Sequence, residues 1–238
     1  MTELDEIRER YARRTAVYEP WDPWVYMTRQ ELERRLMSML RRWGMLPAHR
    51  RRLLDIGCGT GSHLLFFVRL GFLPERLVGV DLLEDRITRA KRTLPSAITL
   101  LTADAANVEL PQRSFDIVFQ SMMFSSVLDA DLQRALAERM WSLVCPGGGV
   151  LWYDFTWNNP RNDDVRGVPL RRVRELFPQA QLSMDRVTLA PPLARVVARI
   201  HPMFYSGLNL IPFLRTHILC WLSKPAGRDS QIIQGRVP

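Results

Sequence analysis

The chain has 238 residues, of which 47% are hydrophobic, enough for the core of one α/β domain with additions. Lysine and arginine number 33 and aspartate and glutamate 25, which gives a net charge of +8 at pH 7. The three cysteines lie far apart, which excludes a disulfide framework and a CxxC metal site and favours a reducing cytoplasm. No run of about eighteen apolar residues occurs, so no membrane-spanning segment is expected.

The positive charge is compatible with a nucleic acid, an anionic membrane surface or a phosphate-bearing substrate, and also with a generally arginine-rich composition. The arginines are scattered over residues 8–14, 34–52 and 161–174. They lack the interleaved aromatic residues typical of an RNA-binding sheet. We therefore favour the compositional explanation and do not expect a nucleic-acid partner.

Two helices are predicted at the start of the chain. The first covers residues 2–17 and is followed by Pro20 and Pro23, which stop it. The second covers residues 28–43 and begins with a Thr-x-x-Glu capping box. Its apolar side chains share one face, which predicts packing against a sheet: Leu32, Leu36, Met39 and Leu40.

Strands and helices then alternate along the chain. Strands are predicted at residues 53–56, 78–80, 98–102, 115–120, 150–155, 181–189 and 216–222. Helices are predicted at residues 62–70, 84–94, 130–144 and 169–177. This alternation is typical of a three-layer α/β domain with a mostly parallel sheet of seven strands.

The turn after the first predicted strand has the composition of a nucleotide-binding corner. Gly57, Gly59 and Gly61 stand at alternate positions between a strand and a helix start, where glycine permits tight turns and close approach of a ligand. Ser62 occupies the place of the last glycine in a dinucleotide fingerprint, and no Walker A lysine follows. Asp81 ends the second predicted strand, where a carboxylate can accept hydrogen bonds from both hydroxyls of a ribose.

Five motifs in this order resemble those of the class I S-adenosylmethionine-dependent methyltransferases. They are found at residues 55–61, 78–81, 102–105, 115–118 and 143–149. The resemblance covers about residues 50–155. It implies a three-layer Rossmann-like methyltransferase fold, whose seven-stranded sheet is mostly parallel with an antiparallel last strand, and S-adenosylmethionine as the cofactor.

The resemblance assigns the glycine loop and two carboxylates to one half of this cofactor. Gly57, Gly59 and Gly61 are expected beneath the aminoacyl end and the ribose. Asp55 is expected to reach the methionyl ammonium, directly or through water, and Asp81 to accept the ribose hydroxyls.

Four further residues are assigned to the cofactor by the same resemblance. Leu82 is expected to pack on the adenine, and Asp104 and Ala105 to meet the adenine amino group and a ring nitrogen. Gln120 is expected to place its backbone carbonyl near the methionyl end. For Asp55 and Asp104 a role in a turn or cap is the alternative, because aspartate is common at strand ends.

The acceptor side is less well defined by the sequence. A hydroxyl acceptor needs a base, and Asp154 or Tyr153, at the end of the fifth predicted strand, are the candidates. The fourth predicted strand lacks the Asn/Asp-Pro-Pro-Tyr/Phe tetrad of many DNA-adenine and glutamine N-methyltransferases. It also lacks the histidine of many small-molecule O-methyltransferases.

A loop rich in amides and aromatic rings follows the fifth predicted strand and suits polyhydroxylated groups. Its candidate substrate-binding residues are Trp157, Asn158, Asn159 and Arg161, with turn formation and core packing as the alternative. Residues 124–129 and 158–162 resemble a bacterial subgroup of these methyltransferases that is associated with surface-polysaccharide synthesis. The four histidines show no metal-ligand spacing, and no metal site is predicted.

The resemblance also implies a domain organisation. Residues 1–49 are expected to form a helical lid over the cofactor, with simple packing against the sheet edge as the alternative, and residues 50–223 the methyltransferase domain. The polar, glycine-containing composition of residues 224–238 predicts a flexible tail. For Trp21 and Trp24, positions in the lid and in the core remain equally open.

Residues 190–214 are an apolar insertion between the last two predicted strands, with few charges. The favoured hypothesis is a lid that packs over the active site, because monomers rarely expose a large apolar patch. The alternative is an element lying in an anionic bilayer surface, with arginines at the level of the headgroups.

The sequence thus predicts a cytoplasmic enzyme, with peripheral contact to the inner face of the membrane left open. The expected reaction is O-methylation of a small-molecule or carbohydrate acceptor, including a lipid-linked glycan. Two alternatives stay open: an RNA or protein methyltransferase, and a non-catalytic S-adenosylmethionine-binding partner that regulates another enzyme.

Overall fold

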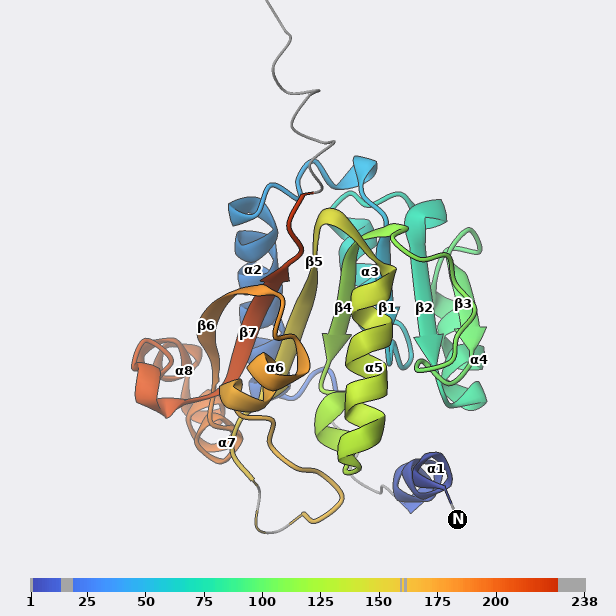
Figure 1. Cartoon of the computed structure of the whole chain (residues 1–238). Helices are drawn as coiled ribbons and strands as arrows, with labels where there is room; N and C mark the ends of the chain where they lie inside the picture. Colours follow the sequence, from blue (N-terminus) through green and yellow to red (C-terminus); the bar gives the residue numbers. More distant parts are fainter. Residues whose placement is uncertain (1, 14–18, 159, 161, 227–238) are drawn as a thin grey trace, which may run out of the picture.

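Seven strands form one sheet in the order β3-β2-β1-β4-β5-β7-β6 (Figure 1). This computed structural model describes residues 2–13, 19–158, 160 and 162–226. The strands are β1 Leu53–Ile56, β2 Leu77–Asp81, β3 Thr99–Thr102, β4 Phe115–Ser121, β5 Val144–Phe155, β6 Gln181–Leu189 and β7 Arg215–Ser223. β1 to β5 are parallel, whereas β7 is antiparallel to both β5 and β6. The predicted fold, with its antiparallel last strand, is confirmed.

Helices cover both faces of this sheet and complete the three layers. They are α1 Glu3–Arg13, α2 Pro23–Arg42, α3 Ser62–Arg69, α4 Glu84–Thr93, α5 Ala130–Leu143, α6 Leu170–Leu176, α7 Pro191–Ile200 and α8 Pro202–Leu208. In Figure 1, α5 and α6 lie in front of the sheet and α2 and α3 behind it. Because β1 is buried on both faces, Leu54 packs in the core beneath α5 and Leu53 in the core beneath α2.

The start of the second helix differs from the sequence prediction. α2 begins at Pro23 rather than at residue 28, because proline fits the first turn of a helix, where its missing N–H is not needed. Thr28 therefore lies inside the helix, where its hydroxyl lies 3.2 Å from the hydroxyl of Tyr205. The predicted end of the first helix, after Arg13, falls outside the described residues.

The insertion between β6 and β7 folds as α7, α8 and a short 3-10 turn, Pro212–Leu214. Glu31 of α2 ties this insertion to the sheet, because its buried carboxylate accepts hydrogen bonds from the Thr188 N–H and the Tyr205 hydroxyl. Thr188 has a φ of 64°, and β6 and β7 pair regularly on either side of it but not at Thr188 itself. The Glu31 carboxylate thus replaces the missing sheet partner of this N–H group.

The beginning of the predicted C-terminal tail is anchored. The Lys224 ammonium donates to the carbonyl oxygens of Trp141 and Val144, and its backbone pairs with Gly147 and Gly148. The remainder of the predicted tail, from residue 227, falls outside the described residues.

Replacing Asp129 tests the predicted cap of α5. Its carboxylate accepts a hydrogen bond from the Leu132 N–H at 2.6 Å. We expect Asp129→Ala to lower the free energy of unfolding by about 1 kcal/mol, measured by urea denaturation. Asp131→Ala, which removes an exposed carboxylate from the same helical turn, is the control. An equal loss in both variants would contradict the capping role.

Candidate functional site

A cavity of about 270 Å³ lies at the carboxyl ends of β1, β2 and β4. Its lining includes Ile56 and Gly57 after β1, Asp81 at the end of β2 and Ser121 at the end of β4. α1 lies across this edge of the sheet (Figure 1). This edge is where α/β sheets bind their ligands.

The glycine loop adopts backbone angles that favour glycine, and it reaches the cavity through Gly57, whereas Gly59 and Gly61 do not line it. Gly57, Gly59 and Gly61 have φ values of 73°, 56° and 82°. A Cβ atom on Gly57 would lie 2.8 Å from Cγ of Met123, and one on Gly61 would lie 2.5 Å from Cδ1 of Leu94. The positive φ values favour glycine at all three positions, and at Gly57 and Gly61 a Cβ atom would also be crowded.

Asp81 fixes the loop and faces the cavity. Its Oδ2 accepts a hydrogen bond from the Gly59 N–H at 2.8 Å, and its Oδ1 accepts one from the Leu83 N–H at 2.9 Å. Each oxygen keeps a lone pair for a further donor, so two ligand hydroxyls can still be bound. Leu82, which also lines the cavity, offers an apolar surface beside the carboxylate.

Asp55 is a buried carboxylate with an unused acceptor. Its side chain is 1% exposed, and its Oδ2 has no hydrogen-bond partner. Burial, together with the negative charge of Asp81, raises the pKa of Asp55 to about 8. Such a group is poised to accept a positively charged donor, which would supply the missing partner and favour the ionised form.

Asp104 and Ala105 line the cavity at the end of β3, as expected. The Asp104 carboxylate also closes a turn, because it accepts hydrogen bonds from the Ala106 N–H and the Asn107 side chain. The turn-forming role that was the alternative for Asp104 is therefore present together with its place at the cavity.

Gln120 is fully buried and does not line the cavity. Its amide donates to the carbonyl of Tyr153 and accepts from the Met123 N–H, at 3.2 Å each. These bonds hold the turn after β4, in which Met122 has a φ of 58°, an unusual value for a residue with a side chain. Gln120 thus positions Met122 and Met123, which do line the cavity.

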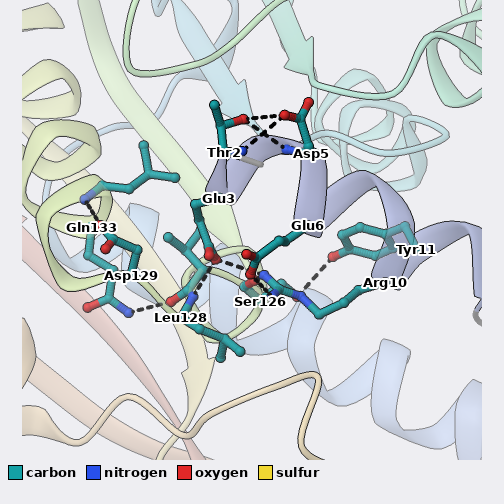
Figure 2. A network of polar contacts seen from close by, with 12 residues as sticks. Thr2, Glu3, Asp5, Glu6, Arg10, Tyr11, Ser126, Leu128, Asp129 and Gln133 are labelled. Atoms are coloured by element: carbon teal, nitrogen blue, oxygen red, sulfur yellow. Dashed lines mark hydrogen bonds and ion pairs between the residues drawn. The ribbon is translucent and has the colours of Figure 1, made fainter.

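α1 forms the outer wall of the cavity with Leu4, Ile7 and Tyr11. Figure 2 shows how polar contacts fasten this helix. The Glu3 carboxylate accepts from the Leu128 N–H at 3.0 Å and from the Arg10 guanidinium at 2.7 Å.

Ser126 is the second anchor of α1. Its carbonyl accepts a hydrogen bond from Arg10, and its hydroxyl accepts one from Tyr11. The guanidinium of Arg86, another lining residue, lies 4.2 Å from the centre of the Tyr11 ring. No sequence pattern predicted a place at the cavity for Glu3, Tyr11 or Arg86, because only the folded chain brings the first helix to this edge of the sheet.

The predicted lid is thus only partly correct. α1 covers the cavity. α2 instead packs its apolar face on the side of the sheet that α3 also covers, and it contributes no lining residue. Trp21 is exposed, and Trp24 packs with the α7 cluster. The expectation that residues 190–214 form a lid over this cavity is wrong, since none of them lines it.

Neither candidate base reaches the cavity. Asp154 is fully buried, accepts from the N–H groups of Ser125 and Phe155, and has its pKa raised to about 7 by burial. Tyr153 is buried with its hydroxyl 2.8 Å from that of Thr188, and burial raises its pKa. The structure corrects this expectation, because β5 is covered on both faces and its alternating side chains enter the two packed layers.

The structure describes two of the four candidate substrate-binding residues. Trp157 is 66% exposed, and Asn158 is exposed with its side-chain oxygen accepting from the Gly167 N–H. Neither lines the cavity. Asn159 and Arg161 fall outside the described residues.

The described residues offer neither a metal cluster nor a membrane-spanning helix. In this part of the chain, no group of three or more His, Cys, Asp or Glu side chains could hold a metal ion. None of its helices is both long and apolar enough to cross a bilayer.

Comparison with known proteins connects this geometry to a family. Residues 53–148 match the family model described as a methyltransferase domain. The chain is 31% identical over 156 residues to trans-aconitate 2-methyltransferase of Afipia carboxidovorans, which covers 65% of this chain and 54% of that protein. The chain is also 30% identical over 106 residues to a malonyl-(acyl-carrier protein) O-methyltransferase of Bacteroides fragilis. This match covers 44% of this chain and 20% of that protein. The chain thus spans about half or less of these curated relatives.

Solved structures agree on the fold. Magnesium protoporphyrin IX methyltransferase from Synechocystis, with S-adenosylmethionine bound, superposes with a TM-score of 0.58 at 15% identity, over 94% of this chain and 98% of that one. A cyclase shares the fold too, with a TM-score of 0.57 at 16% identity over 81% of this chain and 82% of that one. The fold alone therefore does not determine the reaction.

The raised pKa of Asp55 predicts a pH dependence of stability. The folded protein holds this proton up to about pH 8, whereas the unfolded chain releases it near pH 4. The free energy of unfolding should therefore fall as the pH rises through this window. We expect Asp55→Asn to show a shallower fall than the wild type in urea denaturation between pH 5 and 8.

The control is Asp85→Asn, which removes a carboxylate from an exposed position of α4. The raised pKa of Asp154 acts in the same direction, so part of the fall remains in every variant. An identical pH dependence in wild type and Asp55→Asn would contradict the assignment of a protonated Asp55.

Removal of the Glu3 carboxylate should release α1 from the cavity. Glu3→Ala leaves the Leu128 N–H and the Arg10 guanidinium without their acceptor, so amide hydrogen exchange in α1 should quicken by about tenfold. Glu9→Ala, exposed on the same helix, is the matched control. Unchanged exchange in Glu3→Ala would show that other contacts hold α1 in place.

Proposed function

We propose that the protein is an S-adenosylmethionine-dependent methyltransferase. The observation that carries the proposal is one cavity lined by Gly57 of the glycine loop and by Asp81, whose carboxylate holds the loop at Gly59. The buried, partly unpaired Asp55 precedes Gly57 by two residues and does not itself line the cavity. The match of residues 53–148 to a methyltransferase domain supports the proposal. A solved methyltransferase of the same fold, which contains bound S-adenosylmethionine, is compatible with it.

The residues present fit this cofactor group by group. Asp55 would accept the methionyl ammonium, which would complete the hydrogen bonding of its Oδ2 atom. Asp81 would accept the ribose hydroxyls, and Leu82, Asp104 and Ala105 would surround the adenine. Gln120 would act by holding the turn of Met122 and Met123, not by touching the cofactor with its side chain.

The cofactor supplies a sulfonium methyl group that is already a strong electrophile. The chain therefore has to align an acceptor atom with this methyl group and keep water away from it. Ile7 and Tyr11 of α1 are placed to exclude water on the outer side of the cavity.

For the acceptor, we propose an oxygen atom of a small molecule or a carbohydrate, including a lipid-linked glycan. The sequence of the loop after β5 supports it, because asparagines follow the exposed Trp157 there. The small-molecule and acyl-carrier acceptors in the names of the curated relatives are compatible with this class. The +8 charge is the observation that favours the alternative of an RNA acceptor.

Loss of the Asp81 carboxylate should weaken cofactor binding. We expect Asp81→Ala to lower the affinity for S-adenosylmethionine by about tenfold to a hundredfold in calorimetry, because ligand hydroxyls lose a charged acceptor. Asp85→Ala, exposed four residues later, is the control. Circular dichroism checks folding, since Asp81 also holds Gly59. Unchanged affinity in a folded Asp81→Ala protein would overturn the site.

The acceptor class is tested by transfer of a labelled methyl group. Small organic acids, nucleotide sugars, lipid-linked glycans and RNA are offered separately to the wild-type protein. Label on a carbohydrate or small molecule that is lost in Asp81→Ala is the expected result. Label on RNA alone would favour the second class, and tight cofactor binding without any transfer would favour a non-catalytic regulatory partner.

A further inference from the structure

α7, α8 and the turn Pro212–Leu214 together expose large apolar side chains. Six of them are between 55% and 82% exposed, and we call them the apolar face: Val196, Ile200, Met203, Phe204, Leu210 and Phe213. Most soluble monomers avoid such a cluster, because apolar surface in water is unfavourable.

These side chains are additional to those that hold the insertion on the domain. α7 already buries Ala194, Val197 and Ala198 in a cluster shared with Leu189 and Tyr205, and this cluster packs against Trp24 and Met27 of α2. Val196 and Ile200 are one helical turn apart on the exposed side of α7. One side of the insertion is therefore buried against the domain, and the other side is apolar and exposed to solvent.

Within the segment that carries the apolar face, every charged residue is positive. Residues 186–226 contain five lysines and arginines and no aspartate or glutamate, although the whole chain has 25 acidic residues. Arg195 and Arg199 stand on the exposed side of α7, and Arg195 lies 5.0 Å from the ring of Trp24. This combination of exposed apolar side chains and cations fits an anionic surface.

The apolar face also has a functional position. β6 runs in the same direction as β5, since both are antiparallel to β7, so α7 begins at the carboxyl edge of the sheet. The cavity opens at this same edge. Figure 1 shows α7 and α8 at one end of that edge and α1 at the other.

We propose that the apolar face docks on an anionic lipid bilayer, with the arginines at the headgroups and the aromatic side chains below them. A second copy of this chain fits less well. In a two-fold contact the same patch meets itself, which would bring Arg195 and Arg199 against their own copies without any acidic partner. The proposal is independent of methyl transfer, and it would bring the cavity close to acceptors held in a membrane.

Vesicle co-sedimentation of the full chain tests the proposal. The vesicles are phosphatidylcholine alone and phosphatidylcholine with phosphatidylglycerol, at low and high salt. We expect binding to the anionic vesicles that weakens with salt. Phe204→Ser with Phe213→Ser should reduce binding by about tenfold or more, because two large apolar side chains are lost. Arg199→Gln should weaken binding to anionic vesicles by a few fold.

Leu65→Ser with Leu73→Ser is the matched control, since these two side chains are 41% and 37% exposed elsewhere on the protein. Sedimentation velocity without lipid tests the competing occupant. The proposal is overturned if no anionic vesicle binds at low salt, or if the Phe204 and Phe213 pair binds like the control pair. A third outcome also overturns it: the wild type is a dimer, the Phe204 and Phe213 substitutions dissociate this dimer, and the wild type does not bind lipid.

Discussion

The contact between the Asp81 carboxylate and the Gly59 N–H is the interaction on which the cavity depends. It joins the end of β2 to the glycine loop after β1, at 2.8 Å. Without it the loop would lose the acceptor that holds its left-handed glycines in place, and one wall of the cavity with them. The same negative charge contributes to the raised pKa of Asp55, so one carboxylate shapes the loop and prepares its neighbour for a cation.

The carboxyl edge of the sheet is divided between two kinds of surface. At β1, β2 and β4 it forms a cavity with polar and apolar lining residues, enclosed by α1 through the contacts of Glu3, Arg10 and Tyr11. At β6 it continues into α7, whose outer side is apolar and cationic. β5 lies between them in the sheet and is buried on both faces, which is why its aspartate and tyrosine stabilise packing instead of meeting a ligand.

Six buried side-chain polar atoms of the described residues lack a hydrogen-bond partner, and one of them, Oδ2 of Asp55, is a carboxylate oxygen. Asp154, Gln120 and Glu31 each accept from backbone N–H groups near strand ends, as buried polar atoms require. The Oδ2 atom of Asp55 has no such partner. A carboxylate oxygen left unpaired beside a preformed loop costs free energy unless a ligand completes it, so it is a stronger sign of a binding site than the loop alone.

The sequence by itself determined the sheet, the glycine loop and the cavity residues that follow directly from strand ends. Gly57, Asp81, Leu82, Asp104 and Ala105 could be placed because parallel strands bring their carboxyl ends to one edge, whatever the rest of the chain does. Local capping was also readable, as at Asp129.

Only the tertiary structure decided which side chains face a ligand and which face the core. Asp154 and Tyr153 looked like acceptor-side residues in the sequence, yet the helices on both faces of β5 enclose them. Glu3 and Arg86 carry no motif, because their role arises from contacts between segments far apart in the chain. The position of residues 190–214 was equally invisible, since an apolar helix face has the same pattern whether it covers a cavity or faces solvent.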